Sequence, residues 1–164
     1  MNAWEPKVLL WRVLRGIEAG IIGGLAMLAL LIAAMMFRGY PWWAQPTLLG
    51  TTFYGLRSIV AGPNRATIAG GALHLVITGV VGAVFGVMCG GVRRRQRLLL
   101  LGTLAGMVWS MLADAVFWRR VNPLVPMYSP QPATLLSHAL FGACLGYMGR
   151  GMNGASDAQD DPTG

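Results

Sequence analysis

The chain has 164 residues, enough for one domain, and its 13 lysines and arginines against 6 acidic residues give a formal net charge of +7. Hydrophobic residues make up 55% and charged residues only 12%, roughly half the charged share of soluble domains, which excludes an ordinary soluble fold. The basic residues flank apolar runs and form no patch with interleaved aromatic residues, so we expect the lipid bilayer as a partner and no nucleic acid.

The first fifteen residues combine tryptophan with basic residues beside an apolar run. Trp4, Lys7, Trp11, Arg12 and Arg15 alternate with valine and leucine. Tryptophan and arginine next to a span are typical of the membrane interface. We therefore predict an amphipathic juxtamembrane helix in residues 1–15 that leads into the first span.

The first span is predicted at residues 17–37, about 31 Å at the helical rise, which matches the hydrocarbon core. This apolar run is longer than a signal-peptide core and no clear cleavage site follows it, so we expect it to remain as an anchor. Gly20 and Gly24 form a packing face at four-residue spacing. Glu18 can pair with Arg15 three residues before it, and the alternative is a proton-coupling carboxylate.

Residues 38–65 form a long connection that is rich in tryptophan, tyrosine and proline. Pro41 and Pro46 stop the first helix from continuing. The segment from Thr47 to Ala61 is apolar but too short for a span, so we predict a short interfacial helix there.

The second span is predicted at residues 68–91 and carries His74 near its start. A very short loop with four arginines follows it, and such loops stay in the cytoplasm. Both termini are then cytoplasmic, in a bacterial-type cytoplasmic (inner) membrane, although Arg38, Arg57 and Arg65 would lie outside. The packing glycines of this span are Gly82, Gly86 and Gly90, and the topology arginines are Arg93, Arg94, Arg95 and Arg97.

The third span is predicted at residues 98–118, with packing glycines Gly102 and Gly106 and one acid, Asp114, inside the apolar run. The proline-rich segment 119–132 predicts an extended, stiff connector. A fourth span follows at residues 134–149, about 24 Å long, with His138, Gly142 and Gly146 on one stripe. Residues 151–164 predict a disordered acidic tail.

Together these elements predict an all-α fold, an integral membrane four-helix bundle with short interfacial helices and a four-span domain at residues 16–150. Each half has a glycine-striped span, an outer loop with prolines and a returning span with one histidine. This pattern indicates a parallel repeat or a chance resemblance between two low-complexity halves. The glycine faces also allow homo-oligomerisation or assembly into a larger membrane complex.

Three polar residues of the spans are predicted at similar depth. His74, Asp114 and His138 each lie four to six residues inside the outer end of their span, on its small-residue stripe. If the helices cross in the right-handed sense, the three side chains meet near the outer face. The simplest interpretation is interhelical hydrogen bonding.

Two cofactor hypotheses remain as alternatives. A b-type haem could bind between His74 and His138, since histidines from two helices can ligate its iron axially. A divalent metal could bind His74, Asp114 and His138, for structure or transport. We do not expect a hydrolytic enzyme, because the adjacent residues Ser137 and His138 diverge by about 100° on a helix and cannot form a nucleophile–base pair.

The two cysteines, Cys89 and Cys144, lie in apolar runs and are predicted to be buried thiols. The sequence predicts a small non-enzymatic integral membrane protein or accessory subunit without a cofactor. The alternative is a protein that binds haem b or a divalent metal. The sequence does not indicate the cellular process in which the protein acts.

Overall fold

The structure, a computed structural model, describes residues 5–150 and is all-helical there, with no strand in that range. Residues 1–4 and the predicted acidic tail at 151–164 lie outside the described residues. The elements in chain order are α1 (Pro6–Phe37), α2 (Ala44–Tyr54), η1 (Leu56–Ser58), α3 (Arg65–Cys89), α4 (Arg95–Leu112), the π-helical turn η2 (Ala113–Phe117), α5 (Trp118–Val121), α6 (Leu124–Tyr128) and α7 (Gln131–Met148).

Three helices are long and apolar enough to cross a membrane: Pro6–Phe37, Arg65–Cys89 and the continuous run Arg95–Val121. The prediction of an all-helical transmembrane protein is confirmed at this level. The fourth predicted span corresponds to α7, which has 18 residues and is not among the three. The four-span bundle therefore stays a prediction.

Residues 6–15 are the first turns of α1 and not a separate surface helix. Pro6 occupies the first helical turn, where its missing N–H costs nothing, and no proline interrupts the next 31 residues. The whole helix has 32 residues, about 48 Å at the helical rise, and so extends beyond a hydrocarbon core of roughly 30 Å.

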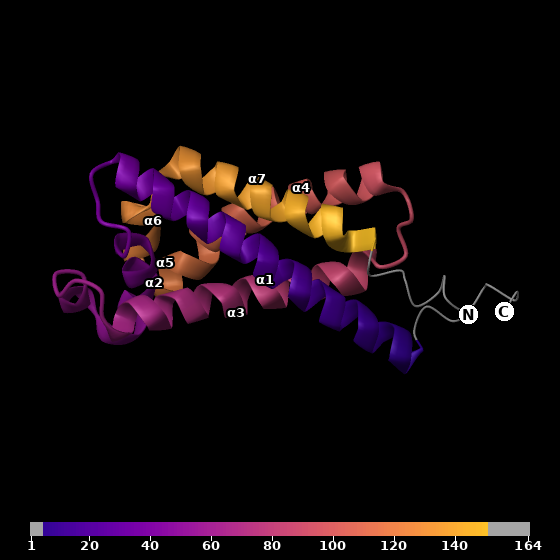
Figure 1. Ribbon diagram of the computed structural model, residues 1–164, viewed down its shortest axis with the longest axis horizontal. Helices are drawn as coiled ribbons and strands as arrows, with labels where there is room; N and C mark the ends of the chain where they lie inside the picture. The colour runs from indigo at the N-terminus through magenta and orange to yellow at the C-terminus, as the bar shows by residue number, and fades with distance from the viewer. Residues whose placement is uncertain (1–4, 151–164) are drawn as a thin grey trace, which may run out of the picture.

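The long helices form two pairs that meet through α1 and α7. α1 packs along α3, α4 packs along α7, and α1 also contacts α7, whereas α3 and α4 barely touch beyond their connecting turn. Figure 1 shows this arrangement, with α2, α5 and α6 grouped at one end of the molecule. We call this the α2 end, and the opposite end, with the α3–α4 turn, the Arg93 end.

Glycine backbones form the contact inside each pair. A Cβ atom on Gly82 of α3 would overlap the backbone of Gly16 and Gly20 in α1. In the second pair, Gly102 of α4 and Gly142 of α7 face each other in the same way. Helices in lipid associate by such close backbone approach, because apolar surface gains little from leaving lipid. The remaining predicted glycines also face the partner helix of their pair: Gly24 against Thr78, Gly86 and Gly90 against Arg12, Gly106 against His138 and Gly142, and Gly146 against Leu98 and Leu99.

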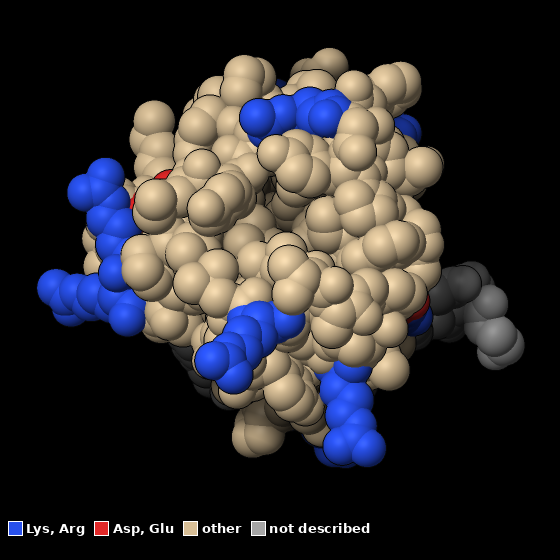
Figure 2. Space-filling view, turned by 90° about the vertical axis from the view of Figure 1, so that its left-hand side faces the viewer, with Lys and Arg blue, Asp and Glu red and all other residues tan. Residues whose placement is uncertain are grey.

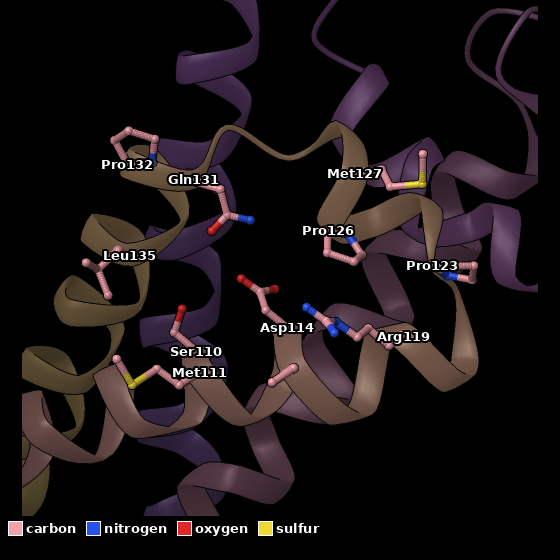
Figure 3. Close-up of a pocket in the computed structure, with 11 residues that line it drawn as sticks. Ser110, Met111, Asp114, Arg119, Pro123, Pro126, Met127, Gln131, Pro132 and Leu135 are labelled. Carbon is pink, nitrogen blue, oxygen red and sulfur yellow. The ribbon is translucent and has the colours of Figure 1, made fainter.

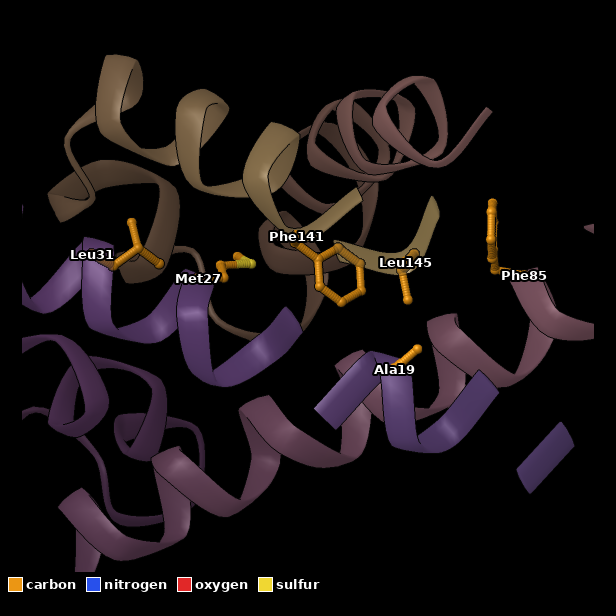
Figure 4. Packing of buried hydrophobic residues seen from close by; sticks show 6 residues of the cluster. All are labelled: Ala19, Met27, Leu31, Phe85, Phe141 and Leu145. Atoms are coloured by element: carbon orange, nitrogen blue, oxygen red, sulfur yellow. The ribbon is translucent and has the colours of Figure 1, made fainter. Parts of the chain in front are cut away.

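Bulky side chains fill the space where α1, α3 and α7 converge. In Figure 4 Phe141 and Leu145 of α7 lie near Ala19 and Met27 of α1, and this cluster also contains Leu31 and Phe85. Large apolar side chains on the outer faces remain exposed, for example Ile68 at 76% and Met88 at 78%. A bilayer would cover these faces, so the polarity pattern is that of a membrane domain.

The predicted interfacial helix in the first connection is α2, and it is buried rather than laid on the surface. Residues 45–51 are all buried. A Cβ on Gly70 of α3 would overlap the Pro46 carbonyl, and one on Gly50 would overlap the Ala66 carbonyl. α2 therefore packs backbone to backbone on α3 and forms part of the fold.

The prediction of an extended connector at residues 119–132 is wrong. α5 continues the third span to Val121, and α6 forms between Leu124 and Tyr128. Pro123 lies at the N-cap of α6 and Pro126 lies in its first turn, where proline removes no hydrogen bond. The Asn122 side-chain oxygen accepts from the Leu124 N–H at 3.3 Å and supports this start.

Candidate functional site

His74 and His138 are both buried and both donate a ring proton to a backbone carbonyl. The Nε2 of His74 lies 2.9 Å from the carbonyl oxygen of Gly24 in α1, and the Nδ1 of His138 lies 2.8 Å from that of Thr134. A carbonyl oxygen only accepts, so the proton lies on Nε2 in His74 and on Nδ1 in His138. In the neutral rings, His74 Nδ1 and His138 Nε2 remain as acceptors.

Asp114 lies in the π-helical turn η2, between α4 and α5. A π turn adds a residue to a helical turn and changes the direction of the side chains around it, and such turns are frequent at functional sites. The carboxyl group is half-buried and has no hydrogen bond or ion pair with residues 5–150. Asp114 is therefore a polar group inside a span that is available to a ligand.

The three predicted site residues line one small cavity of about 40 Å³ near the α2 end. Two further polar groups face this space from outside the spans. The Oε1 of Gln45 in α2 and the Oγ of Ser129 after α6 are buried and have no hydrogen-bond partner among the described residues. Gln45 is only 2% exposed and Ser129 only 8%. We call the space lined by His74, Asp114, His138, Gln45 and Ser129 the polar chamber.

Apolar and aromatic side chains surround the polar chamber. Trp109, Phe117 and Trp118 line it from the third span, and Met27 and Leu31 from α1. On the side toward the Arg93 end, the chamber borders the hydrophobic cluster that contains Phe141 and Leu145. The polar groups are therefore enclosed in a low-dielectric environment, where an unsatisfied acceptor is costly.

The two cofactor hypotheses fit this chamber differently. A haem needs a pocket of roughly 300 Å³ or more, as other ligands of its size do. The cavity between the histidines is about 40 Å³, so a haem ligated by both residues stays a prediction that needs the surrounding helices to move apart. No group of three His, Cys, Asp or Glu side chains in residues 5–150 is arranged to hold a metal. The metal site of His74, Asp114 and His138 stays a prediction, and the three side chains would have to move closer together to bind one ion.

A second, open cavity adjoins the chamber at Asp114. Its volume is about 880 Å³, and it lies between the end of the third span, α6 and the start of α7 (Figure 3). We call it the lateral groove. Its lining residues are Ser110, Met111, Asp114, Ala115, Arg119, Pro123, Pro126, Met127, Gln131, Pro132 and Leu135.

Asn122 is a structural polar residue that the sequence reasoning missed. It is 4% exposed, and its Nδ2 donates to the Leu48 carbonyl and to the hydroxyls of Thr51 and Thr52, all in α2. It therefore joins the α5–α6 segment to α2 across 70 to 74 residues of sequence. The only sequence feature that could have indicated this role is the Asn-Pro pair at residues 122 and 123. The same pair also occurs in ordinary exposed turns, so it did not distinguish a buried asparagine.

The topology arginines occupy the Arg93 end. Arg93, Arg94, Arg95 and Arg97 are exposed in the α3–α4 turn and the first turn of α4. The Arg95 guanidinium also lies 4.5 Å from the centre of the Tyr147 ring in α7. Glu18 pairs with Arg15 at 2.7 Å on the exposed surface, as the simpler prediction had it.

The two cysteines lie apart from this site. Cys89 and Cys144 are free thiols, both half-buried, and the predicted role for them is packing. Comparison of the chain with protein-family models, with curated proteins and with solved structures gave no match.

Proposed function

We propose that the chain is a small, non-enzymatic, four-span protein of a bacterial-type cytoplasmic membrane that acts as a binding or accessory subunit through its polar chamber. The observation that supports this proposal is the convergence of His74, Asp114 and His138 on one small cavity. Each residue comes from a different long helix, so the fold brings them together. In this proposal α7 is the fourth span, about 27 Å long, close to the hydrocarbon thickness.

The size and lining of the chamber suggest a small polar ligand. A water molecule needs roughly 10–15 Å³ of such space, so about 40 Å³ holds a few waters or one small ion. Ser137, the serine next to His138 in sequence, does not pair with that histidine: its Oγ donates to the Thr134 carbonyl at 2.8 Å. These features favour binding over chemistry.

A divalent cation is the second candidate, and the histidine hydrogen bonds favour it. Metal-binding histidines usually donate their other ring N–H to a carbonyl or carboxylate, which fixes the ring. His74 and His138 both have this arrangement, with hydrogen bonds to the Gly24 and Thr134 carbonyls. The free nitrogens and the Asp114 carboxylate would be the ligands.

The chamber can be tested with divalent ions and chelator-washed protein in mild detergent. If the second candidate holds, Zn²⁺ or Mn²⁺ at a hundred times its dissociation constant stabilises the fold by about 2.7 kcal/mol, seen as a higher melting temperature. His138→Gln removes this shift, whereas Cys144→Ala, in the same helix but outside the chamber, keeps it. An unchanged shift in His138→Gln contradicts a metal role for the chamber, and a visible haem spectrum would contradict the small-ligand proposal as a whole.

The proposed topology places both termini and the Arg93 end in the cytoplasm. Eight basic residues lie toward this end and five toward the α2 end, in agreement with the positive-inside rule. Figure 2 views the α2 end, where basic side chains are spread over the face and its edge. The Arg93-end residues are Lys7, Arg12, Arg15, Arg93, Arg94, Arg95, Arg97 and Arg150, and the α2-end residues are Arg38, Arg57, Arg65, Arg119 and Arg120.

Single cysteines in a cysteine-free background test this orientation. Val60→Cys lies at the α2 end, where Val60 is 89% exposed, and Gln96→Cys lies at the Arg93 end without removing an arginine. We expect an impermeant thiol reagent to label position 60 in intact cells and position 96 only after permeabilisation. The opposite pattern would invert the proposed topology, and labelling of both positions from outside would contradict the number of spans.

A further inference from the structure

The lateral groove presents two opposite charges to the same space. Figure 3 shows the Asp114 and Arg119 side chains projecting into it from η2 and α5, with Gln131 across from them. Within residues 5–150 neither side chain forms an ion pair, although they are five positions apart on one continuous helix. A ligand with one positive and one negative group would complement both charges.

The groove is also amphipathic along the third span. Ser110 and Arg119 are nine residues apart, about 13 Å along the helix axis. Arg119 lies beside the loop at the α2 end, whereas Met111 and Leu135 lie deeper and are 68% and 42% exposed. In a bilayer, Arg119 is then at headgroup level and the deeper walls meet acyl chains. A free, water-soluble zwitterion would leave those apolar walls uncovered.

We propose that the lateral groove binds a phospholipid with an ethanolamine headgroup. The phosphate contacts Arg119, the ammonium group contacts Asp114, and an acyl chain follows the wall formed by Met111 and Leu135. The choice of lipid follows from charge complementarity: an anionic lipid without an amine would place no positive group at Asp114. Guanidinium and phosphate form strong charge-assisted hydrogen bonds, and so do ammonium and carboxylate.

The polar chamber supports a primary amine over a quaternary ammonium. Asp114 lines both cavities, so the ammonium group at Asp114 lies at the mouth of the chamber. Behind it, Gln45 Oε1 and Ser129 Oγ are buried oxygens without a hydrogen-bond partner among the described residues. A primary ammonium offers three N–H donors to such acceptors, directly or through water, whereas a trimethylated ammonium offers none.

Native mass spectrometry of the delipidated, chelator-washed full chain tests this proposal, with phosphatidylethanolamine, phosphatidylcholine and phosphatidylglycerol in equal amounts. We expect about tenfold preference for phosphatidylethanolamine over each of the others, the size of one charge-assisted hydrogen bond. Asp114→Asn removes the preference over phosphatidylglycerol, because only a lipid with a positive amine gains from the Asp114 carboxylate. Arg119→Gln lowers occupancy by every phospholipid about tenfold. Chelator washing removes bound metal, so failure of the metal candidate does not affect the result.

Arg120→Gln is the matched control, because Arg120 is on the same short helix but lines a different surface pocket with Trp109 and Leu112. It leaves lipid binding unchanged. Ala115→Phe fills the groove without altering either charge, so we expect it to block lipid binding. This variant still tests the proposal if Asp114→Asn does not fold. Equal binding of the three lipids, preference for phosphatidylglycerol, or an equal loss in Arg120→Gln would overturn the proposal.

Discussion

Gly82→Leu is expected to destabilise the protein by about 3 kcal/mol or more, whereas Gly71→Leu in the same helix leaves its stability nearly unchanged. A Cβ at position 82 would overlap the Gly16 carbonyl and the Gly20 backbone in α1, which cannot rotate away as a side chain could. At position 71 a Cβ would have no atom within 4 Å. The larger side chain at position 82 therefore separates α1 from α3.

Thermal unfolding in detergent, followed by tryptophan fluorescence, measures this difference. Gly142→Leu is the equivalent change in the second pair, since a Cβ there would overlap Gly102 of α4. We expect it to be as damaging as Gly82→Leu. Equal melting temperatures for the variants at positions 71 and 82 would show that backbone contact between α1 and α3 does not hold the pair together.

Asn122→Ala is expected to destabilise the protein by about 2–3 kcal/mol through the loss of buried hydrogen bonds. The Asn122 amide is the polar connection between α2 and the α5–α6 segment, with donor distances of 2.8 Å to Thr51 and 3.0 Å to Thr52. Without it, these hydroxyls and the Leu48 carbonyl lose a buried donor. Melting temperature and hydrogen exchange of residues 45–51 report the loss, which is expected to be local to the α2 end.

Two further variants separate the contributions of the amide. Asn122→Asp keeps the oxygen that accepts from the Leu124 N–H but replaces the donor with a buried charge, so we expect it to be at least as unstable as Asn122→Ala. Thr52→Val removes one half-buried acceptor and costs about 1 kcal/mol or less. A fully stable Asn122→Asp variant would mean that the donated hydrogen bonds contribute little.

The elements near the loops show where a sequence pattern misleads. Pro41 and Pro46 predicted an interrupted, interfacial segment, yet Pro46 lies in the first turn of α2 and its carbonyl contacts Gly70 of α3. Proline at the start of a short helix and proline in an extended connector give the same local pattern. The same ambiguity at Pro123 and Pro126 concealed α6.

The polar chamber was predictable only in part. The depth of His74, Asp114 and His138 follows from their positions in apolar runs, because the helical rise converts residue number into depth. Gln45 and Ser129 lie outside the spans, and nothing in their local sequence distinguishes them from exposed loop residues. The π-helical turn at Asp114 had no signal either, since its sequence, ADAVF, is compatible with an ordinary α-helix.

The amino-acid sequence alone was sufficient for the all-helical class, the membrane environment and the glycine faces. Each of these properties depends on composition or on the spacing of residues within one helix. Residues that are close together in the sequence are sufficient to specify both. Tertiary structure decided which faces meet, that α2 is buried, and that Asn122 and Gln45 are buried rather than exposed. These outcomes depend on contacts between segments far apart in the chain, such as Leu48 with Asn122, and a local pattern contains no information about its distant partner.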